Sequence, residues 1–294
     1  MKRKIGFVLA DTHGGNSFGL LSPGTFVKME KPDGEQVDYE LPLNPVQVYL
    51  NGIFEWLLEV AKEYAQGDEI LFIHNGDLTQ GGVHGSLISP SESVQETVGA
   101  RNLQRAIDAL PTCKAVRIIK GTGVHVFGSG DSESKVGEFL SISNPGKDVR
   151  VLYHNNPTYN GVTLDLAHHG PPTGRHAWLE GNEARYYLRS LMTTELMAGR
   201  VPPRLVMRAH YHNFVKETIS MMVNGSEVES TIVVCPSLCC LDDYARKVVK
   251  SPYLITLGGT FFETIDGRLT NVKVAIKTLD VRTREVIDDN PIIE

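Results

Sequence analysis

The sequence carries two short motifs whose spacing suits a metal centre. One residue separates Asp11 from His13, and one residue separates His210 from His212. Alternate side chains of an extended segment lie on the same side, so each motif can direct two donor atoms toward one point. Carboxylate oxygen and imidazole nitrogen without thiolate suit manganese first, and also iron, zinc, cobalt or nickel, better than a soft-metal or iron–sulfur site.

Two further loops carry donors of the same kinds. Asp77 follows Gly76, which lets the backbone turn, and a carboxylate there can bridge two ions with its two oxygens. The adjacent residues His168 and His169 add one or two imidazoles. A single motif of this sort often arises by chance, and a lone histidine is more often a satisfied surface or core residue than a ligand. The stronger signal is that all of these residues directly follow predicted strands.

The apolar segments before these loops predict buried strands, because each is short, continuous and ends in polar residues. Such strands are expected over residues 5–10, 70–73, 115–119, 162–167 and 205–209. Apolar residues at helical spacing predict helices over 45–67, 92–109 and 181–198. Strands alternating with helices predict an α/β fold with parallel strands, whose carboxyl-terminal loops form the usual place for an active site.

Two regions depart from this alternation. Residues 16–43 contain strand-like pieces around a turn signal at 32–35, which predicts a hairpin insertion that serves as a lid or a contact surface. The part from about 214 to 294 is β-rich. Its strands are expected near 214–222, 228–234 and 270–279. Because no repeat or linker divides the chain, we expect a single domain over residues 1–294.

The composition is that of an ordinary globular protein, with 41% hydrophobic and 22% charged residues in 294. No apolar run approaches the roughly 18 residues of a membrane span. The basic start leads into an apolar stretch too short for an export signal, which favours a cytoplasmic protein. Four cysteines without a C-x-x-C pair fit reduced, buried thiols. The net charge of −6 argues against a surface for broad nucleic-acid adhesion, but not against a local basic groove.

In their order along the chain, these residues resemble the calcineurin-like metallophosphoesterase family. The family pattern is D-x-H, then G-D, then G-N-H-D/E, then a histidine, then G-H-x-H, and the resemblance spans Asp11 to His212. It implies a four-layer αββα sandwich of two mixed sheets flanked by helices. It also implies two divalent metal ions, which would hold a hydroxide for in-line attack on phosphorus.

The resemblance assigns roles residue by residue. Asp77 would be the bridging carboxylate. For the single histidine that is the fourth motif of the family pattern, His168 is preferred to His169, because related sequences carry a His-His-Pro-type run whose first histidine binds the metal. His169 would then contact the ligands and not the ions. The metal ligands implied are Asp11, His13, Asp77, Thr122, His168 or His169, His210 and His212.

The middle of the pattern departs from the family. Thr122 stands where the family has an asparagine ligand, and a hydroxyl is a poorer neutral donor, so the second ion is expected to bind more weakly. His125 comes two residues later than the catalytic histidine of the family, and we expect it to protonate the leaving oxygen. A similar Gly-Thr-x-x-His form occurs in phage-encoded members, which implies a phage or prophage origin. Asn75 and Arg175 are expected to contact the substrate.

These residues predict a metal-dependent phosphoesterase. A phosphodiester of nucleic acid or nucleotide type is preferred slightly over a phosphomonoester, which would make the protein a phosphomonoesterase or protein phosphatase. A non-catalytic scaffold with a degenerate metal site is the second class of hypothesis, and Thr122 is its best support. A carbon-ester hydrolase is set aside, because the chain has no G-x-S-x-G motif. Neither the physiological substrate nor the oligomeric state follows from the sequence.

Overall fold

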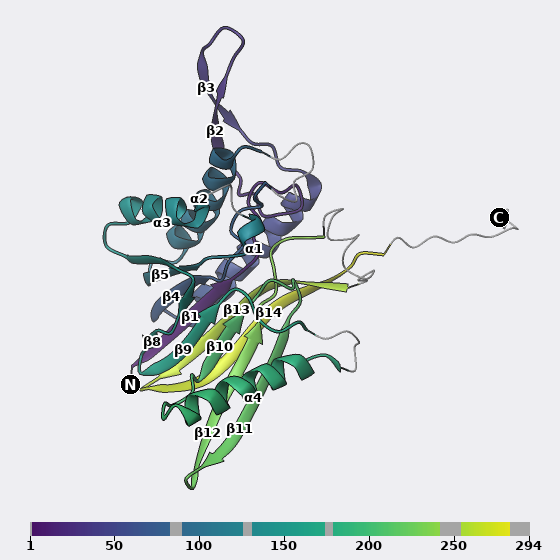
Figure 1. Cartoon of the computed structure of the whole chain (residues 1–294). Coiled ribbons are helices and arrows are strands. Elements are labelled where there is room, and N and C mark those ends of the chain that lie inside the picture. The colour runs from purple at the N-terminus through teal and green to yellow at the C-terminus, as the bar shows by residue number, and fades with distance from the viewer. Residues whose placement is uncertain (1, 83–89, 126–130, 174–178, 242–253, 283–294) are drawn as a thin grey trace, which may run out of the picture.

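The chain folds as a mixed α/β protein with two large sheets and, within the described ranges, four α-helices (Figure 1). The computed structural model describes residues 2–82, 90–125, 131–173, 179–241 and 254–282. The helices are α1 (Pro45–Ala65), α2 (Glu92–Ala109), α3 (Ser132–Ser143) and α4 (Asn182–Met197). Asn44 caps α1 by accepting a hydrogen bond from Gln47 N, and Pro45 fits the first turn, where no backbone donor is needed.

The first sheet has six strands in the order β14-β13-β1-β4-β5-β6. In that order they are Arg268–Asp280, Leu254–Ile265, Arg3–Leu9, Glu69–His74, Cys113–Ile119 and Asp148–Leu152. Strands β1, β4, β5 and β6 run parallel, whereas β13 is antiparallel to both β1 and β14. The loops that follow β1, β4 and β5 therefore leave the same edge of the sheet.

The second sheet has the order β11-β12-β10-β9-β7, with β8 paired to β9. In chain order its strands are β7 (His154–Asn155), β8 (Thr158–Tyr159), β9 (Val162–Ala167), β10 (Leu205–Arg208), β11 (Val215–Val223) and β12 (Ser226–Val234). Strands β9, β10 and β12 run parallel. The loops that follow these three strands also share one edge.

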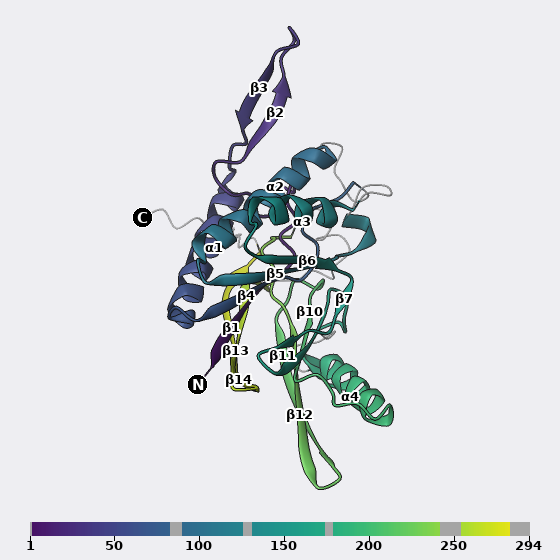
Figure 2. The same ribbon diagram turned by 90° about the vertical axis from the view of Figure 1, so that its left-hand side faces the viewer.

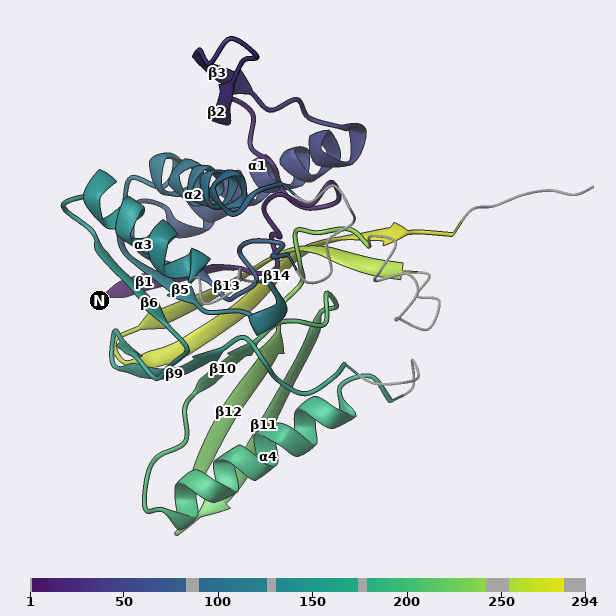
Figure 3. The ribbon, with the colours of Figure 1, turned by 45° about the horizontal axis from the view of Figure 1, so that its top comes forward.

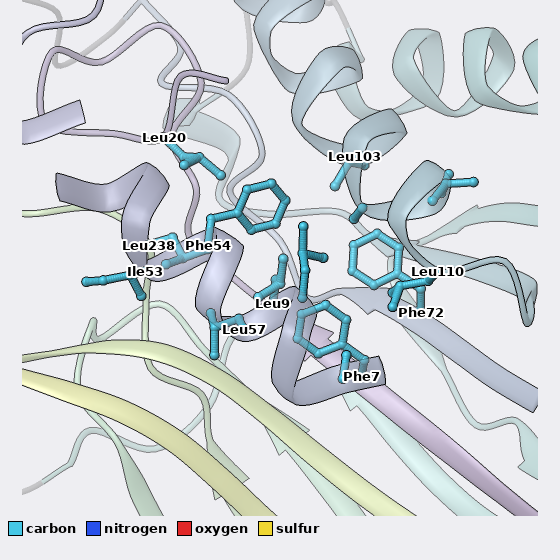
Figure 4. Packing of buried hydrophobic residues seen from close by; sticks show 14 of the residues in the cluster. Phe7, Leu9, Leu20, Ile53, Phe54, Leu57, Phe72, Leu103, Leu110 and Leu238 are labelled. Carbon is cyan, nitrogen blue, oxygen red and sulfur yellow. The ribbon is translucent and has the colours of Figure 1, made fainter. Parts of the chain in front are cut away.

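Among the described residues, three hydrophobic clusters hold the layers together. One joins the first sheet to α1, α2 and α3, and Figure 4 shows Phe7 of β1 among the residues of this cluster, with Phe72 beside Leu103 and Leu110. A second lies between the two sheets, and the third joins α4 to the outer face of the second sheet. Figure 3 shows α1 to α3 and α4 on opposite outer sides of the paired sheets. Each sheet thus buries one face against the other sheet and one against helices.

A two-stranded hairpin, β2 (Phe26–Glu30) and β3 (Gln36–Glu40), projects from the body (Figures 1 and 2). It confirms the expected hairpin within residues 16–43. Val27, Met29, Val37 and Tyr39 are paired across one of its faces.

The strands and helices predicted from apolar patterns are confirmed, with ends displaced by a few residues. Nothing in the sequence patterns indicated α3, β6 or β13. The α3 segment carries four serines and a glycine, which favour helices weakly, and β13 contains Gly258 and Gly259 in its middle. Both elements form through packing, which a local pattern does not record. The single domain remains a prediction.

None of the helices in the described ranges is long and apolar enough to cross a membrane. All four cysteines are buried and without disulfide bonds, as expected.

A buried ion pair lies inside the second sheet. Arg208 on β10 places a guanidinium nitrogen 2.6 Å from Asp165 Oδ1 on β9, and the two side chains are 1% and 7% exposed. The same guanidinium donates to the hydroxyl of Tyr187 on α4, at 2.8 and 3.1 Å. The pair therefore ties β9, β10 and α4 together directly before the loops that carry His168 and His210.

We expect Asp165→Asn to lower the free energy of unfolding by about 3–5 kcal/mol, because it leaves the Arg208 charge buried without a counter-charge. Urea denaturation monitored by circular dichroism measures the change. Asp38→Asn is the matched control, since Asp38 pairs with Lys28 on the exposed hairpin and such a pair contributes less than about 1 kcal/mol. Equal effects of the two substitutions would contradict a special role for the buried pair.

Candidate metal centre

Five parallel strands deliver the predicted site residues to one place. Asp11 and His13 follow β1, Asp77 follows β4, and Thr122 follows β5. His168 follows β9, and the pair His210 and His212 follows β10. Hydrogen bonds join the loops of the two sheets, because His210 N donates to Asp11 Oδ2 at 3.4 Å and His168 Nδ1 bonds to Asn75 O at 2.7 Å. The two sheets therefore contribute to a single cluster.

Asp77 is the centre of this cluster. Its Oδ1 accepts a hydrogen bond from Thr122 N at 2.6 Å. Its Oδ2 accepts one from Thr122 Oγ1 at 3.2 Å and lies 2.9 Å from His168 Nε2. His125 Nε2 and His210 Nδ1 lie 3.7 and 3.9 Å from the same oxygen. One buried carboxylate is therefore shared by groups from three other loops.

Asp11, His13 and His212 form the other half of the cluster. Asp11 Oδ1 lies 3.4 Å from His212 Nε2, and His13 Nε2 lies 3.1 Å from His212 Nε2. Only one hydrogen can lie between those two ring nitrogens, so one of them presents a lone pair. The other nitrogen of His13 is buried and has no hydrogen-bond partner among the described residues. Asp11 Oδ1 is likewise buried without a hydrogen-bond partner there, and unsatisfied buried polar atoms of this kind suit a bound cation.

The orientation of two histidines is that of metal ligands or proton donors. His168 Nδ1 lies 2.7 Å from Asn75 O, and His125 Nδ1 lies 2.7 Å from Gln80 O. A carbonyl oxygen can only accept, so in both rings Nδ1 carries the hydrogen and Nε2 faces Asp77. Ligating histidines usually donate their second nitrogen to such a group, which fixes the ring.

The backbone of the cluster is held in an unfavourable conformation. Asp11, His13, Asp77, His210 and His212 all have positive φ, between 44° and 78°. This left-handed region costs a residue with a side chain about 1–2 kcal/mol. Such strain persists only where the surrounding structure imposes it, and it is typical of functional sites.

Two glycines allow the close approach of these loops. A Cβ on Gly76, which has a φ of +98°, would lie 2.2 Å from His168 Nδ1. A Cβ on Gly121 would lie 2.1 Å from Asp77 Oδ1. Any other residue at either position would push a site residue away.

The charges of the cluster depend on one another. Burial raises the pKa of Asp77, but the charges of His168 and His125 and hydrogen bonds from His168 and His210 hold it well below its usual range. Burial lowers the pKa of His168, but Asp77 and Asp11 outweigh it and raise that pKa to about 9. Burial, with the neighbouring His125 and His212, lowers the pKa of His13 to about 3. Among the described residues, the positive charge that balances the two carboxylates therefore comes from histidines such as His168.

Three groups of donor atoms are close enough to hold an ion, with all atoms of a group within 4.8 Å of one another. In the described ranges these groups are Asp77, His168 and His210; His13, Asp77 and His125; and His13, His212 and Cys239. The first two share Asp77. The residues present thus fit one or two divalent cations, with Thr122 Oγ1 adjoining the first group at 3.2 Å from His210 Nδ1.

Some predicted residues lie at the margin of the cluster. His169 is exposed, and its ring centre lies 5.0 Å from that of His210, so of the adjacent pair it is His168 that faces Asp77. The Asn75 side chain is fully buried and donates to Ala167 O at 3.2 Å, which favours support of the loops. Substrate contact by Asn75 stays a prediction. Arg175 lies outside the described residues.

Sequence patterns did not indicate three participants. The sequence predicts Cys239 as a buried thiol, and no sequence pattern marks Glu133 or the carbonyl of Gln80. A signal for Cys239 was present, since it follows β12, which is parallel to β10, and so leaves the same edge of the sheet. Nothing in a local sequence pattern marks a backbone carbonyl or a distant helix residue as a support.

Comparison of the sequence with protein-family models and with curated protein sequences gives no match. The resemblance to calcineurin-like metallophosphoesterases stays a prediction from the motifs.

Glu133 on α3 lies behind the loop that carries Thr122. Its side chain is 1% exposed, and its Oε1 accepts a hydrogen bond from Gly121 N at 3.3 Å. Its Oε2 has no hydrogen-bond partner within the described ranges. Burial, aided by the charges of Asp77 and Asp131, raises the pKa of Glu133 to about 6, although backbone hydrogen bonds oppose this.

We expect Glu133→Gln to stabilise the metal-free protein above pH 6 and to change little below pH 4.5. The pKa rises from 4.5 to about 6 on folding, so the folded state favours the protonated acid, and stability is lost as the pH rises through that window. The difference of about 1.5 units corresponds to about 2 kcal/mol. Urea unfolding at pH 4.5 and pH 8 in the presence of a chelator measures it.

Glu138→Gln is the matched control, because Glu138 is exposed on the same helix. A gain of equal size at both pH values, or in both variants, would show that Glu133 is not destabilised by its own ionisation.

Proposed function

We propose that this protein is a metal-dependent phosphoesterase of the calcineurin-like type, with two divalent ions at the Asp77 cluster. The observation that carries the proposal is the position of Asp77, a buried carboxylate that belongs to two different groups of histidines. A carboxylate has two oxygens, each with two lone pairs, so it can contact both ions of a two-metal site. The layered α/β fold and the order of motifs along the chain support the same family.

The proposed ligands divide into two halves around Asp77. One half comprises Asp11, His13 and His212, and the other comprises Thr122, His168 and His210. When bound, the ions would supply Lewis acidity and a water of lowered pKa. Manganese is the first candidate for the harder half, in which a carboxylate and a hydroxyl accompany two imidazoles.

His125 is suited to protonate the leaving oxygen. The hydrogen bond from His125 Nδ1 to Gln80 O holds the ring. Thr79 Oγ1 donates to the backbone carbonyl of His125 at 2.8 Å, so both the side chain and the backbone of His125 are held in place. His125 is half-buried beside the cluster, where Nε2 can reach a group bound next to Asp77. General acid catalysis of this kind contributes typically about 10²–10⁴ in rate.

A phosphodiester is preferred over a phosphomonoester. Among the described residues, the groups that hold down the pKa of Asp11 and Asp77 are histidines and not arginines or lysines. Positive charge for the substrate would therefore come mainly from bound ions. A phosphodiester carries one negative charge and a monoester nearly two at neutral pH. The diester therefore needs less positive charge in the site to balance it. Nucleic acids and nucleotides both offer this bond.

We expect the protein with added manganese to hydrolyse bis-p-nitrophenyl phosphate faster than p-nitrophenyl phosphate. Asp77→Asn should abolish this activity and the bound metal, because it removes the shared carboxylate charge. His125→Ala should keep the metal and lower kcat by about 10²–10⁴. Metal analysis of the purified proteins accompanies the kinetic measurements.

Asp38→Asn is the matched carboxylate control, since Asp38 is exposed on the hairpin and pairs with Lys28 away from the cluster. It should retain metal and activity. Bound metal without turnover on any phosphoester would favour a non-catalytic scaffold, and a protein that binds no metal would refute the proposal.

A further inference from the structure

Cys239 differs from the other cysteines in its surroundings. Cys113 and Cys240 belong to the hydrophobic cluster beneath α1, and Cys235 belongs to the cluster between the sheets. Cys239 is equally buried but belongs to none of the three hydrophobic clusters. Its sulfur instead joins His13 and His212 in one of the groups of donor atoms that lie within 4.8 Å of one another.

The segment that carries Cys239 is fixed on both sides of the sulfur. Leu238 N lies 3.3 Å from both Ala10 O and Asp11 O, which fastens the segment to the loop of the first metal motif. Cys240 N donates to Phe18 O at 2.8 Å. Ser237 Oγ accepts a hydrogen bond from Cys239 N at 3.1 Å and donates to Cys239 O at 2.8 Å. The position of the thiol therefore follows from the same loops that position Asp11 and His13.

The distances allow the sulfur and the two imidazoles to share one ion. Zinc binds sulfur at about 2.3 Å and nitrogen at about 2.0–2.1 Å, so two such ligands in neighbouring positions on one ion lie about 3–3.6 Å apart. Atoms already within 4.8 Å reach that separation through small side-chain movements. The thiol donates its hydrogen to Cys240 O at 3.2 Å, whereas metal binding would use a sulfur lone pair.

We propose that Cys239 binds, through its sulfur, the ion held by Asp11, His13, Asp77 and His212. This rests on the proposed function, because it requires an ion in that half of the site. The sulfur–metal bond replaces the S–H bond, and the proton passes to solvent. A thiolate selects zinc or iron, whereas Thr122 and a shared carboxylate suit a harder ion. The two halves of the site would therefore prefer different metals.

The test is a cobalt(II) titration of the full-length protein after treatment with a chelator. The wild type should show a thiolate-to-cobalt charge-transfer band in the near ultraviolet, which imidazole and carboxylate ligands do not produce. Cys239→Ser should lose the band and still bind cobalt in the other half of the site. Its zinc affinity should fall by at least about tenfold, with a smaller change for manganese.

Cys240→Ser is the matched control, since it alters the neighbouring buried thiol and should retain the band. Should Cys239→Ser fail to fold, X-ray absorption of the zinc-loaded wild type decides the matter, with a sulfur shell at about 2.3 Å expected. Cobalt or zinc bound without any sulfur signal would overturn the role of Cys239 and leave the proposed function intact. Failure of the wild type to bind any metal would overturn both.

Discussion

Two buried carboxylates set the central constraint on this structure. Asp11 and Asp77 are almost fully removed from solvent, and among the described residues the positive charge that favours their ionised state comes from surrounding histidines. Burying such charges without a partner would cost several kcal/mol each. Five strand ends must therefore bring their loops to one point, and five residues adopt left-handed backbone conformations there. The stability needed to hold that arrangement comes from the apolar clusters, which reach the site through Ala10, Leu78 and Ala209, the chain neighbours of Asp11, Asp77 and His210.

The second sheet contributes to the site through the loops that follow its strands, and packing inside the sheet positions these loops. The Arg208 guanidinium is held by Asp165 and Tyr187 just before the chain reaches His210. A Cβ on Gly170 would lie 2.6 Å from Arg208 Cβ, so the loop after His168 packs directly on this side chain. A displacement of Arg208 would move both loops. Gly170 packs on Arg208 two residues after His168, and Arg208 itself lies two residues before His210. The charged network thus connects packing in the sheet to geometry in the site.

Much of this arrangement could be predicted, because buried parallel strands are continuous apolar runs and their carboxyl ends carry the chemistry. That rule located Asp11, Asp77 and His210 and the strands before them. The same rule applied to β12 would have indicated Cys239, but a cysteine resembles a buried hydrophobic residue in sequence. The orientation of His125 by a backbone carbonyl and the burial of Glu133 are tertiary facts that no spacing encodes. Residues 174–178, which include Arg175, lie outside the described parts of the structure.

The site is closed on one side and open on the other, which gives the approach of a ligand a direction. Asp11, Asp77 and His168 are at most 1% exposed, whereas the side chains of His125, His212 and His210 are 13%, 21% and 34% exposed. Among the described residues, these partly exposed histidines therefore offer a substrate contact with the cluster. Charge-holding groups lie on the closed side, where a low dielectric strengthens their interaction with an ion. Groups that exchange protons or ligands lie on the open side, where water can restore them after each reaction.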